Sequence, residues 1–190
     1  MAELFANNTI ASSSIPWHKP VKWLRTDTWD IAFGIPPKCG SSSVRAAIVS
    51  LGKEYWPTPP TAVGRRVFVV RDPIKRFKSL WKNKCRDGGK IRNKKGKEDH
   101  PIAGMTPEEL FEYIQEHANY HWTPQHLLLG RVEAEIVRIE DMPKWWAENI
   151  GEGEYPTTNI TKGDIELSPE LEEQLREYYG GDYDLIEGIR

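Results

Sequence analysis

Residues Ile31 to Ser43 read IAFGIPPKCGSSS, and this stretch decides the fold that the sequence predicts. A short apolar run predicts a strand, two prolines and a lysine make a loop, and three serines begin a helix-patterned segment. Backbone N–H groups at a helix N-terminus point at an anion, and the helix dipole favours negative charge there. Lys38 adds a full positive charge, and Ser41, Ser42 and Ser43 add hydroxyl donors. The loop therefore predicts a phosphate or sulfate site.

The position of the lysine indicates which kind of anion loop this is. Nucleotide-binding P-loops follow G-x-x-x-x-G-K-[ST], in which the lysine comes after the second glycine. In this chain five residues separate Gly34 from Gly40, and Lys38 precedes Gly40. This spacing disfavours a kinase or NTPase loop. An ordinary strand-to-helix turn rich in glycine and serine is the alternative that the motif alone leaves open.

A second motif follows the next apolar run of the chain. Val67 to Val70 is continuously apolar, as expected for a strand that is buried on both faces of a parallel sheet. It leads into the segment RDPIKRFKS, from Arg71 to Ser79, in which the proline suits the first turn of a helix. Taken alone, Arg71 could form a strand-end salt bridge and Ser79 could be a solvated helix residue. The two residues at this spacing, in a segment that follows the lysine loop along the chain, instead favour a phosphate site, because a guanidinium can make bidentate contact with a phosphate.

Together the two segments resemble the donor-binding motifs of sulfotransferases. The family's 5′-phosphosulfate loop has the form P-K-x-G-[ST]-[ST]-S, and its 3′-phosphate motif has the form R-D-P-x-x-R-x-x-S. The resemblance implies that the chain binds 3′-phosphoadenosine 5′-phosphosulfate (PAPS), with Arg71 and Ser79 on the 3′-phosphate. The donor-binding residues that it implies are Pro37, Lys38, Cys39, Gly40, Ser41, Ser42, Ser43, Arg71 and Ser79.

A third segment narrows the resemblance to one branch of the family. Tyr120 to Gln125 reads YHWTPQ, which is similar to the H-W-x-P element of carbohydrate sulfotransferases of the chondroitin and dermatan type. Thr158 to Thr161 and Asp182-Tyr183 add weaker likeness, so that the resemblance spans Ile31 to Ile186. One departure is Cys39, where the family more often has a small hydroxyl residue or glycine. A second is that the N-terminal anchor of Golgi members is not expected in this chain.

Composition predicts a single compact domain over residues 1–190, with an N-terminal extension at 1–28. A chain of this length can bury about 70% of its unfolded surface. We expect a cytoplasmic protein without a membrane anchor, because the chain has neither a long apolar run nor a signal peptide pattern. Cys39 and Cys85 are then expected to be reduced thiols. A net charge of −2 argues against general nucleic-acid binding.

Residues 82–99 are strongly basic and are expected to form a mobile loop. The basic residues are Lys82, Lys84, Arg86, Lys90, Arg92, Lys94, Lys95 and Lys97. One interpretation is a solvated loop, and the other is a lid that attracts an anionic acceptor or the donor's phosphates.

The order of the elements predicts an α/β fold. Strands are expected near Asp30–Ile35, Arg66–Arg71 and Glu135–Ile139, with helical segments between them. A capping box at Thr106 and a Ser168-Pro169 start predict two later helices, and Gly180-Gly181 is expected to end the last one. We predict a P-loop-like, three-layer fold whose mainly parallel central sheet is flanked by helices. Ligands of such sheets lie at the carboxyl ends of the strands.

The resemblance also implies a mechanism that needs no metal. Lys38 is expected to stabilise charge on the departing nucleotide, because positioning and electrostatics dominate such transfers. We expect His121 to be the general base, since histidine titrates near neutrality. A structural role for His121, His18 as the base, and a distant glutamate stay open as alternatives.

Three functions follow as hypotheses. The first is a sulfotransferase that acts on an acceptor hydroxyl of a glycan or small molecule, with a carbohydrate favoured by the H-W-x-P element. The second is a kinase or phosphohydrolase with a divergent P-loop, which would bind ATP with magnesium. The third is a polyanion-binding module that uses the basic segment and whose binding depends steeply on salt.

Overall fold

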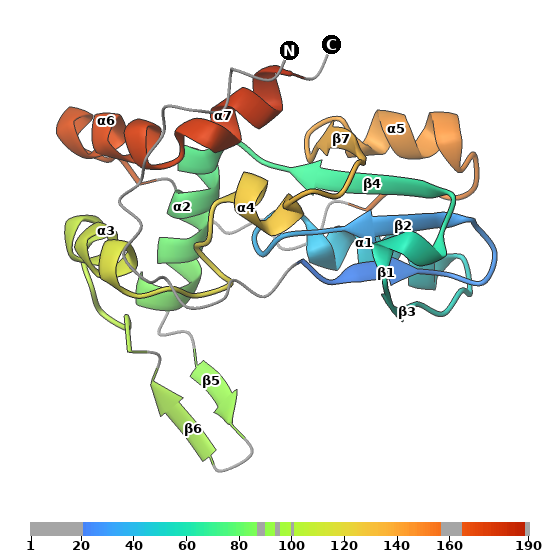
Figure 1. The fold of residues 1–190 in the computed structure, drawn as a ribbon. Coiled ribbons are helices and arrows are strands. Elements are labelled where there is room, and N and C mark those ends of the chain that lie inside the picture. The colour runs from blue at the N-terminus through green and yellow to red at the C-terminus, as the bar shows by residue number, and fades with distance from the viewer. Residues whose placement is uncertain (1–20, 87–89, 94–95, 100, 157–164, 189–190) are drawn as a thin grey trace.

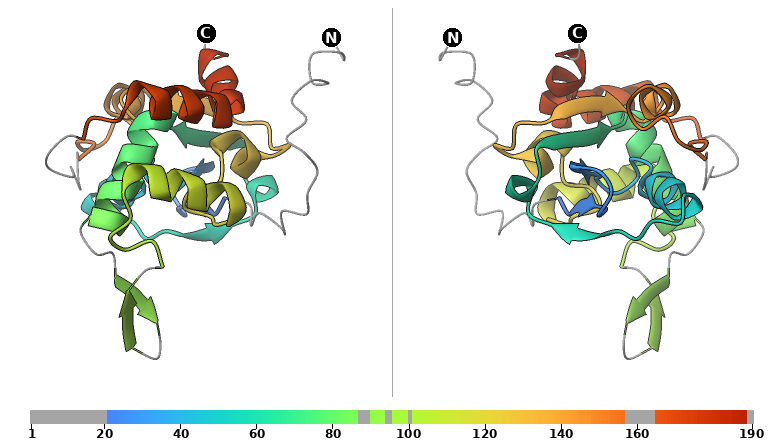
Figure 2. Two further views of the ribbon diagram at one scale, coloured as in Figure 1. Left: turned by 90° about the vertical axis from the view of Figure 1, so that its left-hand side faces the viewer. Right: turned by 90° about the vertical axis from the view of Figure 1, so that its right-hand side faces the viewer.

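A five-stranded sheet with helices on both faces forms the centre of the molecule (Figure 1). The computed structural model describes residues 21–86, 90–93, 96–99, 101–156 and 165–188. The sheet has the spatial order β3-β1-β2-β4-β7 and consists of β1 (Trp23–Arg25), β2 (Ile31–Gly34), β3 (Trp56–Thr58), β4 (Arg65–Val70) and β7 (Glu135–Arg138). A hairpin of β5 (Lys90–Asn93) and β6 (Gly96–Asp99) projects away from this body (Figure 2).

Helices connect and cover the strands. They are α1 (Ser41–Ser50), α2 (Pro73–Trp81), α3 (Pro107–Glu116), α4 (Gln125–Leu129), α5 (Met142–Asn149), α6 (Pro169–Tyr178) and α7 (Gly180–Glu187). A 3₁₀ turn at Pro60–Ala62 precedes β4, and a π-helical turn at Lys82–Arg86 continues α2. The capping box predicted at Thr106 is confirmed, because its hydroxyl accepts from the Glu109 amide while the Glu109 carboxylate accepts from the Thr106 amide. Ser168 likewise caps α6.

The three predicted strands are confirmed to within one residue at each end, as β2, β4 and β7. They pair in parallel, and all of Val67 to Val70 are buried. Val67 and Val69 belong to a core cluster with α1 and α5, whereas Phe68 and Val70 belong to a cluster with α4 and α7. This alternation buries both faces of β4, because successive side chains of a strand point to opposite faces. A third cluster joins α2, α3 and α6.

The prediction of a mainly parallel sheet is only partly right, because the sheet is mixed. β1 pairs antiparallel with both β2 and β3. The connection from β1 to β2 covers only residues 26–30, whereas a parallel crossover needs a dozen residues or more. The Thr26 hydroxyl closes this short turn by accepting from the amides of Thr28 and Trp29. β3 contains Pro57, which is typical of an edge strand.

Several predicted segments differ in detail or lie outside the described residues. The Gly180-Gly181 pair follows the end of α6, but the chain resumes a helix there as α7. Within the segments expected as an extension and a basic loop, residues 23–25 form β1 and residues 82–86 form the π-helical turn. His18 and Thr158 to Thr161 lie outside the described residues. Of the helices described, none is both long and apolar enough to cross a membrane.

Candidate anion-binding active site

The lysine loop connects the carboxyl end of β2 to the N-terminus of α1. Lys38 has a left-handed backbone with φ 69°, and Gly40 caps α1 with φ 80°. No side chain caps the first turn of α1 within the described part of the chain, so its amide groups remain available to a ligand. Ser41 and Ser42 are partly exposed on this turn, and Ser43 is buried. The loop therefore presents backbone amides and hydroxyls at one strand end.

Arg71 brings the second motif to the lysine loop. It follows β4, which is the parallel neighbour of β2, and its Nη1 donates to the Lys38 carbonyl oxygen over 3.1 Å. Its Nε is buried and has no hydrogen-bond partner among the described residues. A buried guanidinium N–H without a partner is costly unless a ligand completes its hydrogen bonding. An oxyanion fits this position.

The charges around Lys38 are mutually repulsive in the absence of an anion. Burial, and then the positive charges of Lys84 and Arg71, lower the pKa of Lys38 to about 8. Its Nζ donates to Oδ1 of Asn83, just beyond α2, over 2.6 Å. Positive charges that lower the pKa of a neighbouring lysine favour a bound anion, which relieves the repulsion.

Arg76 ties the lysine loop to the segment of His121. This arginine is the second fixed arginine of R-D-P-x-x-R-x-x-S, and its side chain is buried. Its Nε donates to the Pro37 carbonyl oxygen over 3.1 Å, and its Nη2 donates to the His121 carbonyl oxygen over 3.2 Å. The structure thus brings together all three sequence motifs through backbone carbonyl groups. Ser79 lies further along α2 and is partly buried.

His121 is partly buried, and its neighbours hold its backbone firmly. The His121 amide donates to Oδ1 of Asn119 over 2.9 Å. Trp122 is buried in the cluster of α2, α3 and α6, and its indole N–H donates to the His117 carbonyl oxygen. The tryptophan of the H-W-x-P element is therefore an anchor for His121 and not an exposed platform for a sugar ring.

Gln125 is a central residue that the sequence analysis did not single out. Its side-chain oxygen accepts from the Arg71 amide over 2.9 Å and from the Cys39 thiol over 3.1 Å. Its side-chain nitrogen donates to the Arg71 carbonyl oxygen over 2.8 Å and to Asp182 over 3.2 Å. Burial raises the pKa of Cys39 to about 12, so the thiol keeps its proton and can donate it.

Tyr155 is a second residue that no motif predicted. Its hydroxyl oxygen would lie 3.7 Å from a Cβ placed on Gly40, and this oxygen is buried without a hydrogen-bond partner among the described residues. The Tyr155 hydroxyl therefore adds a hydrogen-bond donor beside the lysine loop. A lone tyrosine in a connecting segment carries no pattern, so only the structure could find it.

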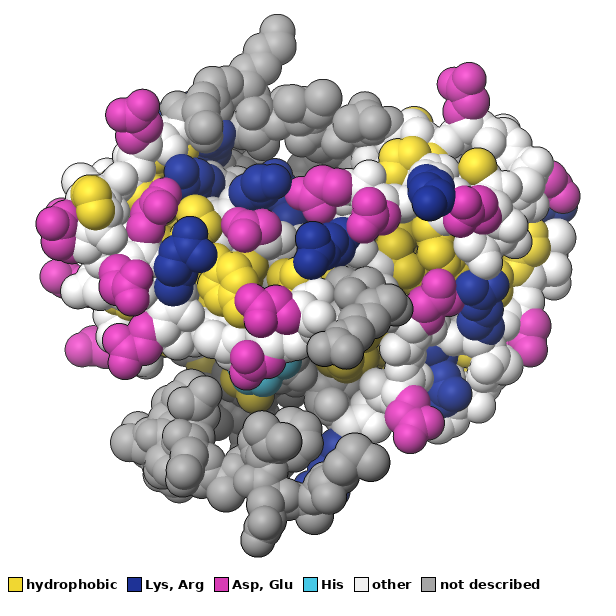
Figure 3. Space-filling model, turned by 90° about the horizontal axis from the view of Figure 1, so that it is seen from above, with side chains coloured by type: hydrophobic (Ala, Val, Ile, Leu, Met, Phe, Trp, Pro, Cys, Tyr) yellow, Lys and Arg dark blue, Asp and Glu magenta, His cyan; other side chains and the backbone are white. Residues whose placement is uncertain are grey.

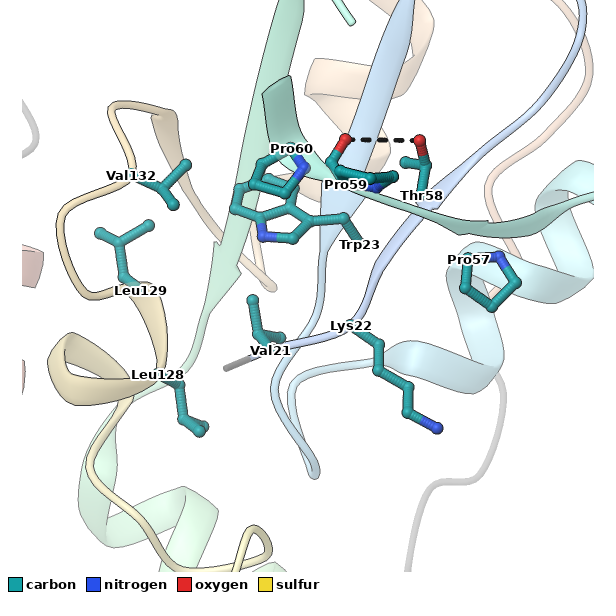
Figure 4. A pocket seen from close by; sticks show the side chains of 10 residues that line it. All are labelled: Val21, Lys22, Trp23, Pro57, Thr58, Pro59, Pro60, Leu128, Leu129 and Val132. Carbon is teal, nitrogen blue, oxygen red and sulfur yellow. Dashed lines mark hydrogen bonds between the residues drawn. The ribbon is translucent and has the colours of Figure 1, made fainter. Parts of the chain in front are cut away.

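The protein also has a pocket of about 540 Å³ (Figure 4). None of the residues predicted to bind the sulfuryl donor lines it. Its walls come from the N-terminal end of β1, the proline-rich segment around β3, and α4 with the turn after it. The lining residues are Val21, Lys22, Trp23, Pro57, Thr58, Pro59, Pro60, Leu128, Leu129 and Val132. The pocket is thus mainly apolar, with Lys22 as its charged residue.

On the face seen from above in Figure 3, lysine and arginine side chains are interspersed with aspartate and glutamate. This face therefore presents no broad field of one sign. Among the residues that the structure describes, no three His, Cys, Asp or Glu side chains gather closely enough to hold a metal ion.

A lysine-bearing loop at a strand end, with an arginine from the neighbouring parallel strand beside it, is the arrangement expected of an enzyme that handles phosphate or sulfate groups. Comparison with family models identifies which class this is: residues 24–142 match the sulfotransferase family. The chain therefore belongs to the sulfotransferase family and is an enzyme of sulfuryl transfer, which implies an acceptor that bears a hydroxyl. Neither the comparison with curated proteins nor that with solved structures gives a match.

Proposed function

We propose that this sulfotransferase uses PAPS as its donor and transfers the sulfuryl group to a hydroxyl of a carbohydrate. The observation that supports the donor most strongly is the meeting of the two motifs, in which Arg71 donates to the Lys38 carbonyl oxygen while its own Nε lacks a partner among the described residues. Two anion-binding elements at one place suit a donor that carries phosphate groups at both its 3′ and 5′ ends.

The residues fit such a donor in distinct roles. When bound, PAPS supplies the sulfuryl group and leaves as 3′,5′-adenosine bisphosphate. The α1 amides with Ser41 to Ser43 would hold its 5′ end, and Arg71 with Ser79 would hold the 3′-phosphate. Three further residues shape the loop. The Pro37 carbonyl oxygen accepts from Arg76, the Cys39 thiol donates to Gln125, and Gly40 is the N-cap of α1.

Lys38 and His121 would carry the chemistry. Lys38 supplies positive charge where the leaving nucleotide becomes negative, which is the largest kind of contribution that a fixed group makes to such reactions. His121 would accept the proton of the acceptor hydroxyl. Its segment is tied by Arg76 to the loop that carries Lys38, so that the two groups are held on one framework.

The carbohydrate acceptor is proposed from the H-W-x-P element alone. Because Trp122 is buried, this element supports the acceptor by fixing His121 and not by stacking on a sugar. A screen of oligosaccharides against aryl and alkyl alcohols, read out as release of the bisphosphate, tests this part of the proposal.

Donor binding is tested by a thermal shift with 3′,5′-adenosine bisphosphate. A ligand at about 100 times its Kd stabilises a protein by about 2.7 kcal/mol. For this chain length each kcal/mol moves the midpoint by roughly 2–4 °C. We expect a rise of several degrees that does not require magnesium and that is much smaller in Arg71→Ala, which still binds the bisphosphate but more weakly. The exposed Arg131→Ala is the matched control and should keep the full shift.

The same measurement, repeated with magnesium-ATP and with heparin as ligands, distinguishes the alternative functions. A shift with magnesium-ATP and none with the bisphosphate would contradict the PAPS proposal and favour the kinase function. Binding to heparin without any response to either nucleotide would favour the polyanion-binding module.

A further inference from the structure

The side-chain amide of Gln125 uses every hydrogen-bonding position that a carboxamide has. It accepts twice through its oxygen, from the Arg71 amide and the Cys39 thiol, and donates twice through its nitrogen, to the Arg71 carbonyl oxygen and Asp182. The residue is fully buried. A glutamine can make four such bonds, and no other residue of that size presents both two donors and two acceptors at one end.

Gln125 therefore contacts both donor motifs at once. One of its partners, Cys39, lies in the lysine loop between Lys38 and Gly40, and the other, Arg71, begins the second motif. It grips the peptide groups on both sides of the Arg71 Cα atom, since it accepts from the Arg71 amide and donates to the Arg71 carbonyl. This double contact fixes the backbone of Arg71 and therefore the direction of the Cα–Cβ bond from which its side chain extends.

Asp182, at the start of α7, fixes the orientation of the amide in turn. Its carboxylate is fully buried and accepts from the side chain of Gln125 and from the backbone amide and Nδ1 of His126, the last two over 2.8 Å. Gly181 permits this approach of α7, because a Cβ there would lie within 2.7 Å of the His126 ring. A buried carboxylate that accepts from Gln125 Nε2 forces the amide nitrogen to that side.

We infer that Gln125 is a positioning residue for the donor, and that Asp182 holds it in the orientation that sets Arg71 and the lysine loop at a fixed separation. The inference rests on the proposed PAPS site and goes beyond it, because it assigns a role in donor affinity to a residue whose four side-chain hydrogen bonds all go to protein groups. The C-terminal helix α7 thereby takes part in donor binding through a chain of two side chains.

The test is the equilibrium Kd of 3′,5′-adenosine bisphosphate, measured by calorimetry on the whole chain. Gln125→Met keeps the length of the side chain and removes all four hydrogen bonds. We expect its Kd to rise by about 10-fold or more, which is the loss of roughly 1.4 kcal/mol. Gln174→Met, at an exposed position of α6, is the matched control and should bind like the wild type.

A double-mutant cycle separates positioning from general damage. In an Arg71→Ala background the guanidinium to be positioned is gone, so Gln125→Met should weaken binding by less than 2-fold further. An equal loss in both backgrounds, or an unchanged Kd in the single variant, would overturn the inference. If the wild type itself does not bind the bisphosphate, the PAPS proposal fails instead.

His126→Ala provides a milder variant if Gln125→Met does not fold. It removes one of the three hydrogen bonds to Asp182 at a side chain that is 31% exposed. We expect a Kd that is about 3-fold weaker, with a cooperative unfolding transition retained. Wild-type affinity in a folded His126→Ala variant would overturn the role of Asp182.

Discussion

Replacing Lys38 with alanine is expected to lower kcat by about 10²–10³-fold, which is the usual effect of removing one preorganised group that stabilises developing negative charge. The substitution should not change the backbone strain at this position, because lysine and alanine are equally disfavoured at the observed φ of 69°. The rate of bisphosphate release from PAPS, with and without a mixture of oligosaccharides, is the measurement. The exposed Lys144→Ala is the control. A kcat within 10-fold of the wild type would exclude Lys38 from the chemistry.

The protonation of Lys38 predicts how the rate depends on pH. Its pKa is lowered to about 8, first by burial and then by Lys84 and Arg71. Only the protonated lysine stabilises the leaving nucleotide, so kcat/KM should fall as the pH rises through about 8. Lys84→Gln removes one of the charges that lower this pKa, so the falling limb should move to higher pH. A limb that stays in place would show that another group controls it.

Replacing His121 with alanine is expected to lower kcat by about 10²–10⁴-fold while the bisphosphate Kd stays within about 2-fold of the wild type. The reason is that two hydrogen bonds hold His121 through its backbone: Arg76 donates to its carbonyl oxygen, and its amide donates to Asn119. The substitution therefore removes the imidazole and keeps these two backbone hydrogen bonds.

The neighbouring His117→Ala is the matched control, because His117 is an exposed histidine whose Nδ1 is paired with the Tyr113 carbonyl oxygen. It should retain full turnover. If His121→Ala keeps full activity, the base lies elsewhere. If it loses donor binding along with turnover, His121 has a structural role.

The parts of the fold that the sequence predicted well are those whose signals are local. The run Val67 to Val70 has to be buried on both faces, and the Thr106 capping box needs only residues within one turn. The donor motifs are equally local, because a strand and the turn after it carry each one. These segments therefore appear in the structure close to where the sequence predicts them.

What the sequence could not predict depends on long-range pairing. β1 has only three residues and pairs with β2 and β3, so its place in the sheet depends on tertiary contacts and not on local sequence. Gln125 gains its importance from partners at positions 39, 71 and 182, which no spacing along the chain relates. Asp182 belongs to a C-terminal segment that resembles the family, but nothing in the sequence indicates that it is buried against Gln125 and His126.

The left-handed backbone of Lys38 has a consequence for the evolution of this protein. A residue with a side chain is strained at a φ of 69°, and glycine is not. Burial, and then the like charges of Lys84 and Arg71, also lower the pKa of this side chain. Lys38→Gly should thus raise the free energy of unfolding by up to about 1 kcal/mol, seen as a higher urea midpoint, while it lowers kcat as far as Lys38→Ala does. Selection for robustness alone would discard this lysine, and the catalytic role that we propose for Lys38 accounts for its presence.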